Sequence, residues 1–583
     1  MGAVRQAVLK LPFALGARGR SSPILVSLAL APMGVILLLV VAMLWISLQK
    51  GVFGTASAVY TLENYRDVLS DPFLLHALKN TAIFTVSTVF FALVLGLPIA
   101  WLTERTTIPG KTLIYAIMTL GLLIPGIYTA MGWTLIAHPR IGILNRWLVD
   151  LFGLTDGPIN IATPVGMGFV QGMSLAALVF ILTAQMFRAM NPSLEEAAKV
   201  HGLNLGRTLW RITLPLALPG ILAAVIYITT IGIATFDIPA ILGLGNRVYM
   251  LSTFLYIKVH PPGSGLPEYG ISGAMGAFMV ILAIFLTCWY GQVLRQGHRF
   301  EVITGKGYRP ALIDLGKWTT LGWSFIALYA VISKLLPLLL IAYAAFTPYF
   351  APPSFEMFGK LSTVHFSNMD WDLVLRGLKN TGFLVLVVPL IVLLFGFSIS
   401  WLVVRSRSRS RYLLEFGAFL PHALPEVIMA IGALMLSLFV IGNILPLYGS
   451  VYLIAIVYVV ARLAFATRAI NGSLLQIHKE LEEAAFVAGL STFRTAWRVL
   501  LPLIWPTLVS VWIWTALLVY RELTVAVFLG VQDNITLPAV IWSYWYGGGI
   551  NKASAVTLLM TLVLTPLILG VWWVGRRSQV PGQ

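Results

Sequence analysis

The chain is poor in charge and in cysteine, and both shortages exclude large classes of protein. Of its 583 residues only 10% are charged, 58% are hydrophobic, and the mean hydropathy is +0.89. A soluble domain carries about 25% charged residues, so this composition indicates an integral membrane protein. The single cysteine, Cys288, excludes an internal disulfide and a cysteine metal cluster. It lies in an apolar run, and we expect it to be a small core residue.

Sequence patterns of nucleotide and metal chemistry are also missing. No Gly-x-x-x-x-Gly-Lys-Ser/Thr phosphate-binding loop is present, since Gly305-Lys306-Gly307 is too short and lies in a polar linker. No His-Glu-x-x-His pattern or catalytic dyad stands out. We therefore predict no catalytic residues and no cofactor bound by this chain, and the sequence assigns no metal ligands.

Long apolar runs are what the chain has in abundance. A helix needs about 20 apolar residues to cross a bilayer, and twelve runs meet this length. They lie near 25–48, 79–103, 112–137, 166–188, 219–243, 271–293, 319–346, 379–403, 413–439, 448–467, 506–530 and 553–575. The first run lacks a convincing signal-peptide cleavage site, and we interpret it as a retained anchor. The runs predict an all-α, polytopic membrane protein with about 12 transmembrane helices.

Basic residues are distributed unevenly over the loops between these runs. If the N-terminus is cytoplasmic, the cytoplasmic segments hold 26 of the 39 Lys and Arg residues and 9 of the 22 Asp and Glu residues. Their net charge is +17 (26 − 9), and the remainder is neutral (13 − 13). The positive-inside rule then places both termini in the cytoplasm. The basic run Arg405, Arg407, Arg409 and Arg411 suits anionic membrane lipid better than nucleic acid, so we predict a lipid partner and no nucleic acid.

One polar pattern occurs twice, at 190–215 and at 477–502, with a constant offset of 287 residues (482 − 195). The first copy contains Glu195, Glu196, Ala197, Ala198, Gly202, Trp210-Arg211 and Leu214-Pro215. The second contains Glu482, Glu483, Ala484, Ala485, Gly489, Trp497-Arg498 and Leu501-Pro502. Polar loops between spans diverge readily, so two gap-free copies indicate that each binds the same kind of partner.

The repeat extends beyond these loops. Leu78-Lys79-Asn80-Thr81 returns as Leu378-Lys379-Asn380-Thr381, and Ile124-Pro125 as Leu424-Pro425, at an offset of 300. The change from 300 to 287 predicts about 13 extra residues in the first half, in the external segment 138–165, where insertions are tolerated. Six spans in each half give two parallel repeats. We place the halves at 1–300 and 301–583.

Each repeated loop is predicted to be a helix-turn-helix lying against the membrane. Glu-Ala-Ala favours a helix, and Gly202 and Gly489 stand where that helix must end and the chain turn. A second helix follows at about 206–213 and 493–500, and Leu-Pro closes each segment. The four glutamates are expected to be available to a partner. An interfacial helix pair without a partner is the alternative, but it does not explain the identical spacing.

Glu-Ala-Ala, three residues, Gly, and Leu-Pro twelve residues beyond that Gly resembles the cytoplasmic motif of ATP-binding-cassette importer permeases. The resemblance covers essentially the whole chain and implies the type I importer permease fold. It also implies two ATPase subunits and a periplasmic or extracellular solute-binding protein as partners, with ATP used by the partners. By resemblance, the ATPase-coupling residues are Glu195, Glu196, Ala197, Ala198, Gly202, Glu482, Glu483, Ala484, Ala485 and Gly489.

A narrower resemblance is to the fused two-half permeases of ferric-iron importers, and it implies a bacterial cytoplasmic (inner) membrane. It is carried by Arg521-Glu522-Leu523-Thr524 and by 236–243, Phe-Asp-Ile-Pro-Ala-Ile-Leu-Gly. Permeases for thiamine, phosphonates and polyamines share similar segments, so these cargoes stay open. The mechanism implied is alternating access. A secondary transporter driven by an ion gradient is the alternative class, and a channel lacks a recognisable filter.

Charges within the spans are expensive and often functional. The candidates for the translocation path are Asp237, Glu426, Arg521 and Glu522, and Lys334 is a further intramembrane charge that we expect to snorkel or pair. Asp237 aligns with Thr524 in the repeat. Ferric iron is a hard cation suited to carboxylate oxygens. The alternative is structural, with Arg521 and Glu522 paired and Asp237 capping a broken helix.

Overall fold

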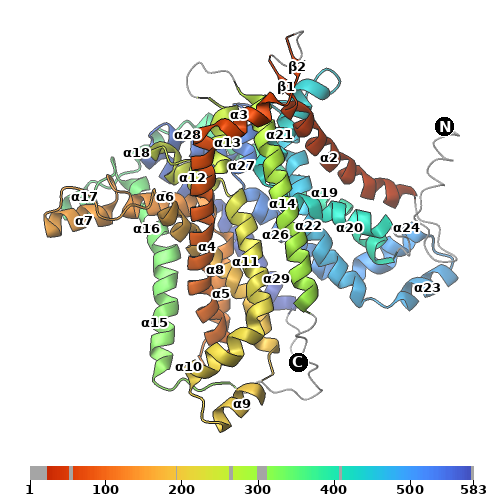
Figure 1. The fold of residues 1–583 in the computed structure, drawn as a ribbon, viewed down its shortest axis with the longest axis horizontal. Helices are drawn as coiled ribbons and strands as arrows, with labels where there is room; N and C mark the ends of the chain where they lie inside the picture. The colour runs from red at the N-terminus through yellow and green to blue at the C-terminus, as the bar shows by residue number, and fades with distance from the viewer. Residues whose placement is uncertain are drawn as a thin grey trace.

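The computed structural model describes residues 23–51, 57–191, 193–261, 267–297, 312–405 and 410–578. Their helices are joined by turns and loops, and the strands form one short antiparallel ladder, β1–β2 (Figure 1). The predicted join between 1–300 and 301–583, the Gly305-Lys306-Gly307 segment, and Arg407 and Arg409 lie outside them.

The elements of the first half run in this order: α2 (Pro23–Ser47), β1 (Gln49–Lys50), β2 (Val59–Tyr60), α3 (Glu63–Ser70), α4 (Pro72–Arg105), α5 (Lys111–Leu123), α6 (Gly126–Ala137), α7 (Ile143–Phe152), α8 (Pro164–Ala189), α9 (Ser193–Val200), α10 (Leu205–Thr208), η1 (Leu209–Thr213), α11 (Leu214–Ala234), α12 (Asp237–Leu242), η2 (Leu244–Asn246), α13 (Leu251–Val259) and α14 (Tyr269–Gly297).

The second half continues with α15 (Trp318–Ala330), η4 (Val331–Leu335), α16 (Leu336–Phe346), α17 (Phe355–Gly359), α18 (Val364–Ser367), α19 (Trp371–Arg405), α20 (Ser410–Ala423), α21 (Glu426–Met435), η5 (Leu436–Val440), α22 (Val451–Gln476), α23 (Lys479–Val487), α24 (Thr492–Thr495), η6 (Ala496–Leu500), α25 (Leu501–Leu503), α26 (Trp505–Tyr520), α27 (Thr524–Leu529), α28 (Leu537–Tyr546) and α29 (Ile550–Ser578).

All twelve predicted spans correspond to helices in this order. Among the described residues, eight helices are long and apolar enough to cross a membrane, and three bent pairs raise the number to eleven. The twelfth predicted span corresponds to α29, whose part from Ile550 to Pro566 is a shorter apolar helix. The prediction of an all-α polytopic protein is therefore confirmed.

Two of the predicted spans are sharply bent at a repeated proline. The axes of α5 and α6 meet at 94°, next to Pro125, and those of α20 and α21–η5 meet at 97°, next to Pro425. Proline has no backbone N–H and pushes the preceding residue towards an extended conformation. The paired Ile-Pro and Leu-Pro of the sequence thus mark two helix breaks, which an apolar run alone does not reveal.

The first membrane helix of each half packs on the other half. Helix α2 contacts α19, α20 and α21, and a Cβ on Gly432 of α21 would meet the backbone of Leu39. In return, α15 and α16 contact α4 and α6, and Pro337 packs against Gly132. Figure 1 shows α2 leaning across the second half and α15–α16 standing beside α4. The two halves are therefore interlocked.

The repeated Leu-Lys-Asn-Thr segment has the same structural task in both halves. Thr81 Oγ1 accepts a hydrogen bond from the backbone of Leu251 (2.8 Å), and Thr381 Oγ1 accepts one from Leu537 (2.9 Å). Asn80 donates to the carbonyl of Tyr249 at 3.1 Å, and Asn380 donates to neighbouring carbonyls at the equivalent place. Each segment holds the start of the short helix that precedes the last span, α13 or α28.

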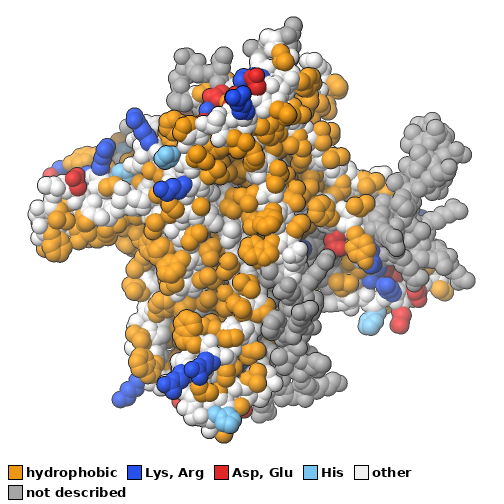
Figure 2. All heavy atoms as spheres, viewed as in Figure 1, with side chains coloured by type: hydrophobic (Ala, Val, Ile, Leu, Met, Phe, Trp, Pro, Cys, Tyr) orange, Lys and Arg blue, Asp and Glu red, His pale blue; other side chains and the backbone are white. Residues whose placement is uncertain are grey.

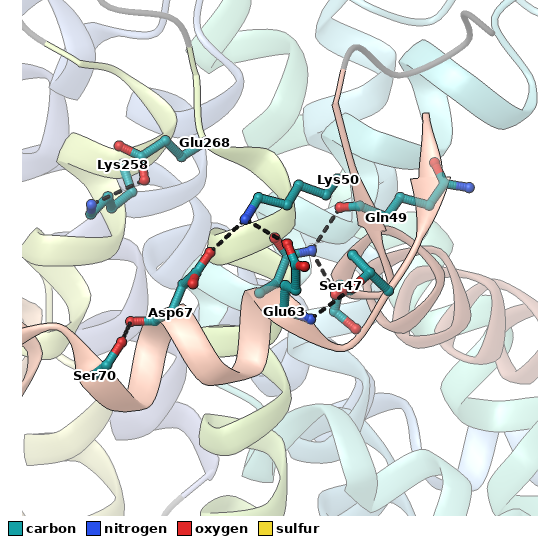
Figure 3. A network of polar contacts seen from close by, with 10 residues as sticks. Ser47, Gln49, Lys50, Glu63, Asp67, Ser70, Lys258 and Glu268 are labelled. Carbon is teal, nitrogen blue, oxygen red and sulfur yellow. Dashed lines mark hydrogen bonds and ion pairs between the residues drawn. The ribbon is translucent and has the colours of Figure 1, made fainter. Parts of the chain in front are cut away.

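A polar network stabilises the surface opposite α9 and α23, at the ladder of β1 and β2 (Figure 3). Lys50 forms ion pairs with Glu63 (2.9 Å) and Asp67 (3.0 Å) of α3, and the buried Asn64 donates to the carbonyls of Ser47 and Gln49. These contacts join the end of α2 to α3. The ion pairs are exposed, so the buried amide contributes more to stability than they do.

Two expectations about the spans are wrong. Leu214-Pro215 does not close the first repeated segment, because helix continues from α10 through the π turn η1 into α11. The wider π turn accommodates a proline that lacks an N–H. Cys288 is exposed on α14 rather than buried, since a membrane helix can present apolar residues outwards to lipid as well as inwards.

Close packing of α4 on α8 generates a first prediction. A Cβ at Gly172 of α8 would lie 2.9 Å from the backbone oxygen of Thr88, whereas a Cβ at Gly472 of α22 would meet nothing within 4 Å. Gly172→Leu should destabilise the protein by about 1–3 kcal/mol through overpacking. The apparent melting temperature of the purified protein should fall, and Gly472→Leu, the matched control, should leave it unchanged. Equal melting temperatures would contradict this packing.

Candidate functional site

The two repeated segments form matching helix-turn-helix elements on one side of the molecule. The first helices are α9 and α23, and they end at Gly202 (φ +77°) and Gly489 (φ +81°). The next residue donates back into each helix, from Leu203 N to Ala198 O and from Leu490 N to Ala485 O, both at 3.0 Å. Only glycine adopts a left-handed backbone without steric cost. The predicted helix ends are confirmed, and α10–η1 and α24–η6 match the predicted second helices.

The first glutamate of each copy is buried in an ion pair. Arg105, the last residue of α4 and fully buried, donates to Glu195, whose other oxygen accepts from Thr213 at 2.7 Å. Arg105 also donates to the carbonyl of Met190 at 3.2 Å. A charge removed from water needs such a partner. The pair ties α9 to the end of α4.

The second half repeats this arrangement. Arg405, at the end of α19, donates to Glu482 at 2.5 Å and to the carbonyls of Leu474 and Ile477. Arg405 lies 300 residues after Arg105, and Ile477 lies 287 residues after Met190. The two copies therefore keep the same internal contacts as well as the same spacing.

The expectation that all four glutamates are available to a partner is wrong for Glu195 and Glu482, because each neutralises a buried arginine. The surfaces that remain exposed are equivalent in the two copies. They consist of Glu196, Ala197, Val200, Glu483, Ala484 and Val487. The valines at the helix ends are 85% and 90% exposed. An apolar side chain so exposed on a rigid helix end suits contact with another protein.

A cavity of about 370 Å³ lies between the two halves. Its lining comes from both sides of each helix break, including Ile124, Gly126, Leu424, Pro425 and Glu426. It also includes Asp237, Arg462, Arg521 and Thr524. The structure therefore brings together three of the four predicted path residues, Asp237, Glu426 and Arg521, at one place.

The axis that relates the two halves passes beside Asp237. The carboxylate of Asp237 accepts a hydrogen bond from Thr524 Oγ1 at 3.3 Å. Thr524 is the residue of the second half that corresponds to Asp237 in the repeat (237 + 287 = 524). Equivalent residues touch each other across a two-fold arrangement only near its axis. Gly126, the counterpart of Glu426, also lies beside Asp237, and a Cβ there would be 2.9 Å from the carboxylate.

Arg462 of α22 is a site residue that the sequence analysis missed. It donates to Glu426 at 2.6 Å, inside the cavity. Arg462 lies within the predicted span 448–467. A charge inside a span was the available signal. Its counterpart in the first half is Leu175, so this ion pair exists in one half only.

Arg521 and Glu522 do not pair with each other. Arg521 donates to the carbonyl of Leu122, and Lys334 donates to that of Gly121 at 3.3 Å. Both carbonyls belong to the last turn of α5, where no intrahelical donor remains, so two cations of the second half cap a broken helix of the first. Glu522 is buried and accepts from the backbone of Val525 at 3.1 Å. It does not line the cavity itself.

The described residues contain no group of three or more His, Cys, Asp or Glu side chains that could hold a metal ion. The cavity instead mixes carboxylates with guanidinium groups.

The apolar helices, the interlocked repeats and the cavity at their axis define a polytopic membrane protein built from two copies of one helical unit. The chain belongs to the family described as Binding-protein-dependent transport system inner membrane component, whose sequence profile matches residues 73–299 and 392–579.

Individual relatives and one solved structure are similar to parts of this chain. The chain is 24% identical over 531 residues to the Ferric transport system permease protein FbpB of Actinobacillus pleuropneumoniae, covering 88% of this chain and 73% of that protein. It is 23% identical over 502 residues to the Fe(3+)-transport system permease protein FbpB 2 of Haemophilus influenzae, covering 85% and 89%. A solved bacterial ABC transporter involved in the import of alginate is 19% identical, with a TM-score of 0.34, covering 50% of this chain and 95% of that chain.

The buried pair of Arg105 and Glu195 generates a second prediction. Glu195→Ala leaves a buried guanidinium without its counter-charge, which typically costs about 3–5 kcal/mol. Glu196→Ala removes an exposed neighbour and should change stability by less than about 0.5 kcal/mol. Chemical or thermal unfolding of the purified protein measures both. If Glu195→Ala were as stable as Glu196→Ala, the carboxylate of Glu195 would not be the partner of Arg105.

Proposed function

We propose that this chain is the membrane-spanning permease of an ATP-driven, binding-protein-dependent importer, and that its cargo is ferric iron. The observation that carries the proposal is the pair of equivalent exposed helix ends, α9 and α23, each joined through a buried ion pair to a membrane helix of its own half. ATP would be used by two separate ATPase subunits that bind these helices, and a solute-binding protein would deliver the cargo to the opposite surface.

Transmission of movement follows from the contacts of the repeated segments. A force applied to α9 reaches α4 through Arg105 and Glu195, and a force applied to α23 reaches α19 through Arg405 and Glu482. Figure 1 shows α9 and α23 at the far ends of two diverging arms. Closure of the ATPase subunits would bring the arms together and open the cavity towards the other surface. Hydrolysis would return it, which is alternating access between halves that move as units.

We further propose that the chain crosses the inner membrane of a bacterial cell with the repeated segments and both termini in the cytoplasm. The basic loops and the positive-inside rule support this orientation. We assign the halves to 1–300 and 301–583. We assign the coupling contact to the exposed residues of α9 and α23, with Glu195 and Glu482 as residues that position those helices.

Ferric iron is supported by the names of the relatives and by the carboxylates at the axis. Carboxylate oxygens suit a hard cation, and Asp237 faces the cavity from the point where the two halves meet. Arg462 and Arg521 would limit how long a cation stays, because a transport path must release what it binds.

The coupling proposal predicts a defect in Gly489→Val. A β-branched residue is strained at φ +81°, so α23 should end differently and dock poorly, although the space around Gly489 is open. ATPase activity of the reconstituted complex should lose its stimulation by the binding protein loaded with ferric iron. Gly206→Val, in the same kind of segment but without a positive φ, is the control.

Three results would each contradict a part of this scheme. Full stimulation in Gly489→Val would exclude α23 as the coupling element. Stimulation by a binding protein loaded with thiamine or polyamine, and none with ferric iron, would keep the importer and change the cargo. Uptake that follows a proton gradient with no co-purifying ATPase would favour the secondary transporter.

The cavity predicts a transport defect in Asp237→Asn, which keeps the shape of the side chain and removes its charge. Uptake of radioactive ferric iron into proteoliposomes should fall about tenfold, equivalent to about 1.4 kcal/mol. Basal ATPase activity should persist because α9 and α23 are untouched. Glu415→Gln, an exposed acid on α20, is the control. Unchanged uptake in Asp237→Asn would remove this carboxylate from the path.

A further inference from the structure

Helix α7 lies in the segment that the first half has and the second half lacks. It follows α6 and precedes α8, at the end of the spans opposite the coupling helices. The corresponding part of the second half, between η5 and α22, contains only turns. The coupling contacts described above do not involve this added helix.

The side chains of α7 divide into two faces. Leu144, Trp147 and Leu151 recur at intervals of three and four residues, which places them on one side of a helix. Trp147 is 53% exposed and Leu151 75% exposed, and Phe152 beside them is also exposed. Arg146 and Asp150 stand on the other side. Leu144 packs against the core, whereas the part of the apolar face that carries Trp147 and Leu151 is uncovered by the rest of the described chain.

The position of α7 identifies what can cover this face. The preceding span ends at Ala137 and the following one begins at Pro164, so α7 lies where the chain leaves the hydrocarbon layer. Figure 2 shows the projection that carries α7 with hydrophobic side chains along its lower edge and charged side chains along its upper edge. The hydrophobic edge continues onto the apolar surface of the membrane helices below it.

We propose that α7 is an interfacial helix that lies on the bilayer surface opposite the coupling helices, with Trp147, Leu151 and Phe152 inserted among phospholipid acyl chains. An amphipathic helix of this kind rests with its apolar side about 5–10 Å into the boundary between headgroups and acyl chains. Tryptophan favours the same depth. A membrane surface fits better than a protein partner, because the apolar face is continuous with the lipid-facing surface of the spans.

Asn145 makes this anchor rigid. It is almost fully buried, and its amide nitrogen donates to the carbonyls of Ala137, His138 and Ile159, the last at 2.7 Å. Its oxygen accepts from the backbone of Ile159 at 2.9 Å. The Asn145 side chain thus joins α7 to the end of α6 and to the irregular segment that leads into α8.

The anchor therefore holds the outer end of α6, and the other end of α6 lies at the cavity. Helix α6 begins at Gly126, which lies against Asp237, and ends at Ala137, which Asn145 binds. A helix α7 held in the interface would fix the depth of α6 in the bilayer.

The test places a fluorescent label on each face of α7. Because Cys288 is the single cysteine, a Cys288→Ala background allows Leu151→Cys and Asp150→Cys to be labelled one at a time with an environment-sensitive fluorophore. The full-length variants, in the complex with the ATPase, are placed in phosphatidylcholine nanodiscs with a lipid spin-labelled near the top of its acyl chain. Both variants should elute as the unmodified complex does.

We expect the spin-labelled lipid to quench the label at Leu151 several-fold more strongly than the label at Asp150. Aqueous iodide should show the opposite preference. A label at Leu151 that iodide quenches and lipid does not would overturn the proposal, because α7 would then lie in water. Protection of Leu151 from both quenchers would also overturn it and would show that protein covers the face.

Discussion

The structure depends on one constraint, that a backbone group freed inside a membrane must find a partner within the protein. Helices break at 124–125, 235–236, 424–425 and 521–523, and residues from all four breaks line one cavity. The charged side chains of this region lie at the ends of the broken helices. Arg521 and Lys334 reach the last carbonyls of α5, and Asp237 and Glu426 begin α12 and α21. Cations at helix C-termini and anions at N-termini are the arrangement that the helix dipole favours.

This constraint also bears on the intramembrane charges that the sequence left open. Asp237 is the first residue of α12 and lines the cavity, and α12 has no side-chain capping hydrogen bond. The pairing of Arg521 with Glu522 does not occur, because each is engaged by backbone groups of a different helix. Lys334 pairs with a carbonyl rather than snorkelling to the surface.

The sequence predicts much of this fold because membrane helices and repeats are local or periodic signals. The order of the twelve spans, the glycines that end α9 and α23 and the inserted segment at 138–165 could all be found without coordinates. The burial of Glu195 and Glu482 could not, because their partners Arg105 and Arg405 lie 90 and 77 residues away in the chain. Arg462 was within reach, since a charge inside an apolar run is itself a signal.

Fusion of two halves in one chain has also allowed them to diverge around the axis. Glu426, Arg462 and Arg521 have Gly126, Leu175 and Ala234 as counterparts in the first half. The second half therefore supplies most of the charge at the cavity, while the first supplies Asp237 and a close-packed glycine. A pair of identical subunits could not hold such an arrangement.

Each half packs its first membrane helix against the other half, so the two halves are mutually interlocked. Neither half can move away from the other without pulling its partner's helix along, because α2 rests on the second half and α15–α16 on the first. These contacts oppose separation of the halves. Rocking about the shared axis is the motion that preserves the contacts of both α2 and α15–α16. The solute path can then open at one end while the other end stays sealed.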